Sequence, residues 1–417
     1  MAASMCRRVF PLGRKFTRFT LQNACQSTRC TYSTAETSTE TQVEVPEAKY
    51  PPIVPPLFAK TAETKEYRTK LIIEGINDKP TATEMIYELS KRQSWHYNIF
   101  PRCFHYSFLD LYKHCMKTVI VEDLPKQIVE LANSPSVESA AEMLKPHVMD
   151  CILQQQLYVY RYKGDPAKRD STAGRQTMEN VMRLLLAGLA GDFHHLRDSQ
   201  IDQDVVVKSF WKRDETKFQF TGNPLFLIRT KEPLPEFISR DDEQLCIGEV
   251  PSWSYAPENV SVFKQHINPV CFPGFKIGNP FTYGHTQIYM SEFNRKKCAE
   301  NKTLEEVLMG IGMSSSFGWL NGLALYQMYN PYRDVTQPMT CQTIVTDGSN
   351  FSFFCYQLNT LGLCSRSADN PLRNVCWYTP DMKLYGDVQD GRIIDFNDDV
   401  LKQTIAFLLN PTMPLEK

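Results

Sequence analysis

The pattern of apolar and polar positions is clearest in residues 340–361, which read TCQTIVTDGSNFSFFCYQLNTL. β-Branched and aromatic residues flank Asp347-Gly348, a dipeptide that can supply the positive φ angles of a tight turn, so the pattern predicts a β-hairpin. The second arm, 351–358, is apolar almost throughout. Such an arm is typical of a strand that is covered on both faces by helices. We therefore expect a buried hairpin within a sheet that helices cover.

Two long helices are predicted on either side of this hairpin. Asn397 is a favourable N-cap, acidic residues follow it, and apolar residues recur at helical spacing across 400–409, which predicts a C-terminal helix. Upstream, Thr303-Leu-Glu-Glu306 predicts the start of a helix that runs towards Tyr329. Glycines inside this second helix either permit close packing or break it near Ser314.

The rest of the chain mixes helical and strand patterns. Helical patterns occupy 81–90, 139–160 with an interruption at Pro146, and 177–190, and strand patterns occupy 204–211, 216–228 and 286–290. The aromatic-rich stretch 95–117 predicts a strand, a loop and a helix. We therefore expect an α+β fold: a mixed sheet with packed helices, a buried C-terminal hairpin and a C-terminal helix.

Segments rich in proline and glycine mark the organisation of the chain. Residues 33–60 predict a flexible linker followed by an extended strap, because each residue before a proline in 50–56 is displaced from the helical region. A ligand for a proline-recognition domain is the alternative interpretation of the strap. Residues 61–417 form the expected globular region, which divides near the irregular segment 251–281 if it comprises two subdomains.

Residues 1–32 have the composition of a mitochondrial presequence. They hold six Lys and Arg, no Asp or Glu, and interspersed Phe. A secretory signal would instead contain a continuous apolar stretch of about 7–15 residues. A basic tail that binds nucleic acid is the alternative. We expect import into the mitochondrial matrix and removal of this segment.

The charge balance changes once the presequence is removed. The whole chain has a formal net charge of −1, and the part after residue 32 carries 40 basic against 47 acidic residues, a net charge of −7. A protein that coats bare RNA through charge alone would be strongly basic. The composition therefore favours a peripheral subunit that contacts mostly protein. No run of 18 apolar residues occurs, so no membrane span is expected.

The sequence offers little evidence for a metal or cofactor. Its thirteen cysteines include no Cys-x-x-Cys pair, which metal sites usually need, so we expect no metal, and Cys271 and Cys355 are interpreted as core residues. Phosphate-loop and dinucleotide-binding motifs are absent, because Gly310-Ile-Gly312 lacks a properly spaced third glycine. We therefore expect no cofactor.

Three groups of residues could nevertheless suggest catalysis. His194-His195 would be awkward joint ligands, since neighbouring helical residues point in different directions, and we interpret them as a polar helix end. His285 is tempting but is more often a hydrogen-bonded structural residue, and Ser314-Ser-Ser316 would need partners that the sequence cannot position. An enzyme, or a retired enzyme fold, that uses loops at 283–287 and 310–316 is the alternative function.

Three local clusters combine cations with aromatic rings, as surfaces that contact ribosomal RNA do. The first cluster lies in an expected exposed loop broken by Gly164-Asp165-Pro166, where alternating rings and cations would face opposite sides of an extended backbone. Solvated surface charge is the alternative for each cluster. The candidate RNA contacts are Tyr160, Arg161, Tyr162, Lys163, Lys168, Arg169, Arg175, Lys212, Arg213, Arg295, Lys296 and Lys297.

A family resemblance extends these inferences. The run 351–361, FSFFCYQLNTL, resembles the C-terminal signature of an animal mitochondrial ribosomal protein family also called programmed cell death protein 9. Short islands at 50–54, 283–287 and 396–401 follow the order that the family shows. The resemblance spans roughly residues 50–410 and is weakest within 160–260.

The resemblance implies a structural protein of the mitochondrial large ribosomal subunit, without catalytic activity, that supports mitochondrial translation. The implied partners are the large-subunit ribosomal RNA and neighbouring mitochondrial ribosomal proteins, among them the related large-subunit protein thirty-seven as a heterodimer partner, and not DNA. A signalling adaptor that uses the strap at 51–56 is a third class of function, which the predicted presequence disfavours.

Overall fold

The computed structural model describes most of residues 61–417. The residues outside this description are 1–60, 82–83, 86, 89–92, 102–107, 162, 165, 292–293, 296–297, 299–303, 364–369 and 414–417. The predicted presequence and the linker with its strap therefore lie outside the described residues. The chain divides into two units, Met1–Thr69 and Lys70–Lys417. Helix α1, Ala62–Asn77, begins in the first unit, and every element below belongs to the second.

The second unit contains a large mixed sheet. Its strand order is β2-β11-β10-β9-β8-β6-β3, with the short β12 paired to β10. The strands are β2 Thr118–Glu122, β3 Gln200–Gln203, β6 Phe226–Thr230, β8 Tyr283–Met290, β9 Met339–Thr346, β10 Asn350–Leu358, β11 Asn374–Tyr378 and β12 Met382–Lys383. Two of the neighbouring pairs, β2 with β11 and β8 with β9, are parallel, and the others are antiparallel.

A small sheet has the order β4-β5-β1-β7. Its strands are β1 Ser94–Ile99, β4 Val207–Arg213, β5 Thr216–Gly222 and β7 Lys264–Ile267. The pair β13 Asp387–Gln389 and β14 Arg392–Ile394 forms a separate ribbon, and η1, Pro257–Val260, is a short 3₁₀ helix. The segment 251–281 therefore contains regular structure, and its β7 pairs with the much earlier β1. A subdomain break in this segment stays a prediction.

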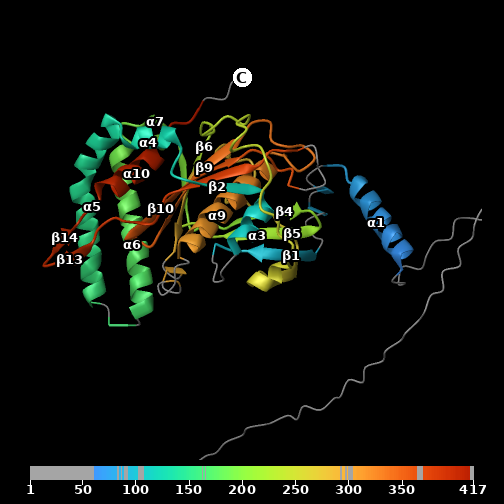
Figure 1. Ribbon diagram of the computed structural model, residues 1–417, viewed down its shortest axis with the longest axis horizontal. Coiled ribbons are helices and arrows are strands. Elements are labelled where there is room, and N and C mark those ends of the chain that lie inside the picture. Colours follow the sequence, from blue (N-terminus) through green and yellow to red (C-terminus); the bar gives the residue numbers. More distant parts are fainter. Residues whose placement is uncertain are drawn as a thin grey trace, which may run out of the picture. The chain divides into compact units, whose positions relative to one another are not determined.

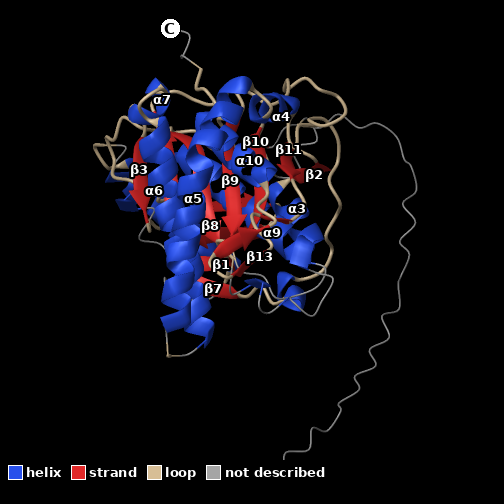
Figure 2. Cartoon of the chain, turned by 90° about the vertical axis from the view of Figure 1, so that its left-hand side faces the viewer, coloured by secondary structure: helices blue, strands red, loops and turns tan. Residues whose placement is uncertain are grey.

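Helices cover both faces of the large sheet (Figure 1). One face packs against α4 Lys126–Ala132, α5 Pro135–Arg161, α6 Pro166–Leu189, α7 His194–Arg197 and α10 Asp398–Leu409. The other face packs against α3 Phe108–Met116 and α9 Leu304–Tyr326, and the small sheet covers α9 from its far side. Figure 2 shows α5 and α6 in front of the strands of the large sheet. The resulting four layers enclose two apolar cores and confirm the predicted α+β fold.

The predicted hairpin is β9 and β10, and residues 351–358 are buried on both faces, as expected. Its turn differs from the prediction in one respect. Gly348 alone has a positive φ, +94°, whereas the Asp347 carboxylate accepts hydrogen bonds from the backbone N–H groups of Ser349 (2.9 Å) and Asn350 (2.7 Å). A side-chain cap thus replaces the second positive φ. The predicted C-terminal helix is also confirmed, with Asn397 accepting from the N–H of Asp399 at 3.0 Å.

Helix α9 is continuous, so its glycines serve close packing and do not break it. A Cβ atom on Gly312 would lie 2.5 Å from Cδ2 of Phe354 in β10. A Cβ on Gly318 would lie 2.8 Å from Cε1 of Phe220 in β5. Since real Cβ atoms almost never come this close to another heavy atom, the glycines allow rings from both sheets to reach the helix backbone.

The predicted interruption of the middle helix at Pro146 is wrong. Helix α5 begins at Pro135 and continues through Pro146 to Arg161. A proline in a helix costs one backbone hydrogen bond and introduces a steric clash. Residues on both sides of it, Leu144 and Val148, are buried in the core shared with α6 and α10. This burial offsets the local cost of the proline.

Candidate nucleic-acid interface

The small sheet has an inner face towards α9 and an outer face of different composition. Inward residues such as Trp211, Phe218 and Phe220 belong to the apolar core. Alternation along each strand and the register between strands assign the following residues to the outer face: Lys208, Phe210, Lys212, Lys217, Gln219, Thr221, His96, Asn98 and Gln265. This set, called here the outer face, contains three lysines and no carboxylate.

Two lysines of the outer face are direct cross-strand partners. Lys212 of β4 is paired with Lys217 of β5, and both side chains are exposed. Two like charges that lie directly opposite each other on neighbouring strands destabilise the sheet. The Nζ atom of Lys212 lies 3.4 Å from the carboxylate of Glu215, whose side chain is 76% exposed, so solvent screens this pair. Within the described residues, no ion pair is formed by Lys217.

The centre of the outer face is polar and partly buried. His96 is only 3% exposed, and burial lowers the pKa of its imidazole, with the charge of Lys217 acting in the same direction. Gln219 is 6% exposed, and its Oε1 atom has no hydrogen-bond partner among the described residues. Asn98 donates to Oε1 of Gln265 at 2.7 Å. The face therefore presents neutral amides between its lysines.

Only one of the two cations predicted in β4 lies on this face. Lys212 points outward, whereas Arg213 points inward, is 7% exposed and donates from Nη1 to the carbonyl oxygen of Leu363. Arg213 is therefore an unfavourable candidate for an RNA contact, which stays a prediction, because consecutive strand residues face opposite sides of the sheet. The same alternation could have identified Lys208 and Lys217, which the sequence interpretation missed.

Arg295 is also an unfavourable candidate for its predicted RNA contact, which stays a prediction. Its guanidinium forms two hydrogen bonds with the Asp381 carboxylate, at 2.5 and 2.7 Å, and a longer ion pair of 3.5 Å with Asp347. The residue is 8% exposed. A buried bidentate arginine of this kind is committed to its partners inside the chain. Lys296 and Lys297 lie outside the described residues.

Most described residues of the first predicted cluster are helical, although Lys163 and Gly164 lie between two helices, where the chain was expected to break. Tyr160 and Arg161 end α5, whereas Lys168, Arg169 and Arg175 lie in α6. The prediction of rings and cations on opposite sides of an extended backbone is therefore wrong.

Arg175 is 40% exposed and is paired within the chain, because its Nε donates to the Glu179 carboxylate at 2.9 Å and its Nη2 donates to that of Asp204. Arg161 and Lys163 are exposed, and an RNA contact at these residues stays a prediction. Tyr162 lies outside the described residues.

The proposed catalytic loop at 283–287 is strand β8, and its polar groups form a closed ring of hydrogen bonds. Gln342 Nε2 lies 3.0 Å from Thr286 Oγ1, which lies 2.9 Å from His285 Nδ1. His285 Nε2 lies 2.9 Å from the carbonyl oxygen of Asn410, whose Nδ2 donates to Gln342 Oε1 at 3.1 Å. Because a carbonyl only accepts, Nε2 of His285 carries the proton.

This ring is structural. His285 is fully buried, and burial lowers the pKa of its imidazole to about 4. Its donor satisfies the carbonyl of Asn410, just after the end of α10. Nε2 of His195 lies 3.2 Å from the carbonyl oxygen of Leu408 in the last turn of α10, so this histidine lies near the carbonyls of α10 and not of its own helix, as had been expected.

The second proposed loop, 310–316, is the interior of α9. The hydroxyl group of Ser315 donates to Ile311 O at 2.6 Å, and that of Ser316 lies 2.7 Å from Gly312 O. Both serines are fully buried. Neither segment of the enzyme alternative is therefore a loop, and neither offers an accessible nucleophile.

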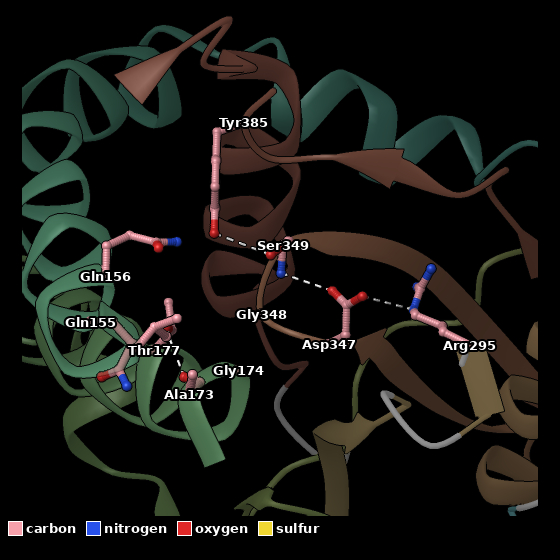
Figure 3. Close-up of a pocket in the computed structure, with 11 residues that line it drawn as sticks. Gln155, Gln156, Ala173, Gly174, Thr177, Arg295, Asp347, Gly348, Ser349 and Tyr385 are labelled. Carbon is pink, nitrogen blue, oxygen red and sulfur yellow. Dashed lines mark hydrogen bonds and ion pairs between the residues drawn. The ribbon is translucent and has the colours of Figure 1, made fainter. Parts of the chain in front are cut away.

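A cavity of about 270 Å³ lies between the α5–α6 pair and the β9–β10 turn (Figure 3). Its polar lining is already engaged: Asp347 holds the turn and Arg295, the Ser349 hydroxyl lies 3.1 Å from that of Tyr385, and Thr177 donates to its own helix at 2.9 Å. A hydrolytic site needs a nucleophile hydrogen-bonded to a base. The described lining residues contain no such pair.

The described residues contain no group of three or more metal-ligating side chains, and no helix among them is long and apolar enough to cross a membrane. Eight described cysteines carry free thiols. Cys355 is fully buried, as expected of a core residue, whereas Cys271 is partly exposed.

Comparisons with known proteins agree on one group of relatives. The chain is similar to the large ribosomal subunit protein mL37 of Rattus norvegicus, with 24% identity over 310 residues, 70% of this chain and 70% of that protein. The mL37 proteins of Gallus gallus and Mus musculus are 23% and 24% identical, over 66% and 64% of this chain and 61% of each relative. The chain thus spans about 61–70% of the length of these relatives.

A family model gives the broader match. The model of the mitochondrial 28S ribosomal protein S30 (PDCD9) family matches residues 15–219 and 212–412, which together include most of the chain. The match includes the buried hairpin, the C-terminal helix and both sheets. The chain therefore belongs to the mitochondrial 28S ribosomal protein S30 (PDCD9) family.

Proposed function

We propose that the protein is a structural constituent of the large subunit of the mitochondrial ribosome and supports translation in the matrix. The observation that carries the proposal is the similarity to mL37 proteins over about two thirds of the chain, combined with family membership. The family description carries a 28S designation, whereas the relatives are named as large-subunit proteins. We assign the large subunit because the relatives' names state it.

The structure supports a role without catalysis. His285 and Ser316, two of the side chains considered for chemistry, are fully buried and hydrogen-bonded inside the chain. Several cations considered for RNA binding are likewise committed to internal partners, such as Arg295 with Asp381. This pattern, together with the net charge of −7 after residue 32, favours contacts made mainly with neighbouring proteins and fewer contacts with ribosomal RNA.

The relative mL37 is itself a candidate partner of this chain. Two related chains with a shared fold can present similar surfaces to one another, as subunits do in pseudo-symmetric pairs. We therefore include the mL37 relative as a heterodimer partner, alongside ribosomal RNA and other mitochondrial ribosomal proteins.

Sedimentation tests the proposal. A matrix lysate is separated on a sucrose gradient, and this chain is followed by immunoblotting beside marker proteins of each ribosomal subunit. We expect the chain to migrate with the large-subunit marker and to leave that position after ribosomal RNA is digested. Migration with the small-subunit marker would refute the subunit assignment. A chain that stays at the top of the gradient in an intact lysate would refute the ribosomal role.

A further inference from the structure

We propose that the outer face of the small sheet binds a single-stranded segment of ribosomal RNA. Lys208, Lys212 and Lys217 would contact phosphates, and the ring of Phe210 would stack on a base. This inference rests on the proposed ribosomal function and names the surface through which the protein reaches RNA.

The charge of the outer face is the first argument. The described strand residues of this face include three lysines and no carboxylate, and the Glu215 carboxylate near Lys212 is largely exposed, although the chain as a whole has more acidic than basic residues. Lys212 and Lys217 are directly opposite one another, at a relative position where like charges are unfavourable. An anion between the two ammonium groups would remove this repulsion. Phosphate is the anion that an RNA strand supplies at regular intervals.

The spacing of the lysines is the second argument. Lys208 and Lys212 lie four residues apart in β4, which places them about 13 Å apart along the strand. Lys217 lies opposite Lys212 on the neighbouring strand β5, and the backbones of the two strands are about 5 Å apart. Three cations therefore lie along a narrow path two strands wide, which suits an extended polyanion better than a single small anion.

The middle row of the outer face supplies groups that recognise bases. Phe210, Gln219 and Asn98 are aligned across β4, β5 and β1. Phe210 is partly exposed, and an aromatic ring on a sheet is a sequence-tolerant platform for base stacking. Gln219 Oε1 is buried without a described partner and would accept a hydrogen bond from an exocyclic amino group of a base.

An acidic protein segment is the competing occupant. Its carboxylates would form ion pairs with the lysines, but they would neither stack on the ring of Phe210 nor donate a hydrogen bond to the buried Oε1 atom of Gln219. Single-stranded RNA uses the cations, the ring and the amide together. The two occupants differ in their response to a change at Phe210, which is the basis of the test.

The first experiment uses the full chain after residue 32 and a fluorescein-labelled 12-nucleotide oligocytidylate, whose bases carry an exocyclic amino group, in an anisotropy assay. Three phosphate contacts predict a slope of log affinity against log salt of about −2. The variant in which all three outer-face lysines become Gln should reduce the slope to near zero. Phe210→Leu should weaken binding by about five-fold or more, because one stacked base contributes at least about 1 kcal/mol.

A matched control keeps the same change in net charge. Three exposed lysines elsewhere, Lys126, Lys276 and Lys383, are changed together to Gln, and the salt slope should remain that of the wild type. Circular dichroism confirms that each variant is folded. Equal losses in the two triple variants, or an unchanged affinity of the Phe210→Leu variant, would overturn the inference.

The second experiment separates this inference from the proposed function. The tagged chain is expressed in cells fed with 4-thiouridine, large subunits are isolated on a gradient, and crosslinked peptides are mapped. We expect RNA crosslinks in the β4–β5 peptides that the outer-face triple variant loses and the control keeps. Chain present in the large subunit without an RNA crosslink in the β4–β5 peptides would overturn the inference alone. Absence of the wild-type chain from both subunits would overturn the proposed function instead.

Discussion

The contact between α9 and the large sheet gives a quantitative test through Gly312→Ala. In an exposed helix, this change stabilises the protein by about 1 kcal/mol, because alanine has the higher helix propensity. At Gly312 the new Cβ would lie 2.5 Å from Cδ2 of Phe354 and closer still to its Cγ. The ring is 1% exposed and belongs to a central strand of the large sheet, so it has little room to move away.

The balance of the two effects is unfavourable. Insertion of a methyl group into a well-packed core costs about 1–3 kcal/mol, and a contact about 1 Å too short belongs at the upper end of that range. After the gain in helix propensity is subtracted, Gly312→Ala should lower the free energy of unfolding by about 2 kcal/mol. The measurement is the midpoint of unfolding in guanidinium chloride, with tryptophan fluorescence as the probe. The midpoint should shift while the dependence of the unfolding free energy on denaturant concentration stays the same.

Helix α9 contains its own control. The nearest atoms to a Cβ on Gly322 are 3.6 Å away, an ordinary van der Waals contact. Gly322→Ala should therefore stabilise the protein by up to about 1 kcal/mol. Adding Phe354→Leu to the Gly312→Ala variant should restore part of the lost stability, because the clashing ring is removed. If Gly312→Ala is as stable as the wild type, the packing argument for the glycines is wrong.

Three further predictions address import, pH and the buried hairpin. Replacement of the four arginines within the first 18 residues by Glu should leave the protein in the cytosol, and unchanged uptake in a fractionation assay would refute the presequence. For His285, the folded pKa of about 4 lies below the ordinary value of 6.5, so stability is complete above pH 6.5 and is lost as the pH falls towards 4, by about 3 kcal/mol. The His285→Gln variant should lack this part of the pH dependence in urea unfolding, and an identical pH profile would contradict the assignment. Phe353→Ala should cost about 3–5 kcal/mol and lower soluble yield and ribosome incorporation together, whereas lost incorporation at full thermal stability would make the strand an interface.

The parts of the fold that local pattern determines could be predicted from the sequence. The hairpin and the C-terminal helix are examples, because the turn at Asp347, the cap at Asn397 and the apolar stripe of α10 are each encoded within a few neighbouring residues. The continuity of α5 through Pro146 could not be predicted in this way. It depends on burial against α6 and α10, which are distant in the sequence.

The candidate interface shows the same limit. Lys212 could be selected from the sequence, and the alternation in β4 was sufficient to disfavour Arg213 and to add Lys208. Arg295 could not be disfavoured, because its partner Asp381 is 86 residues further along the chain. A cation near an aromatic ring in sequence is therefore a weak guide to RNA contact until the pairing of distant carboxylates is known.

The hydrogen-bonded ring around His285 has a consequence for the order of folding. Three of its members, His285, Thr286 and Gln342, lie in β8 and β9, but the carbonyl and amide groups that close it belong to Asn410, which directly follows α10. Until α10 and Asn410 are in place, Nε2 of His285 and Oε1 of Gln342 lack these partners, and an unpaired buried polar group costs about 1–3 kcal/mol. The large sheet therefore cannot reach its final stability on a partly delivered chain. A chain truncated before α10 should therefore be less stable, and we expect it to be cleaved faster by proteases than the full chain.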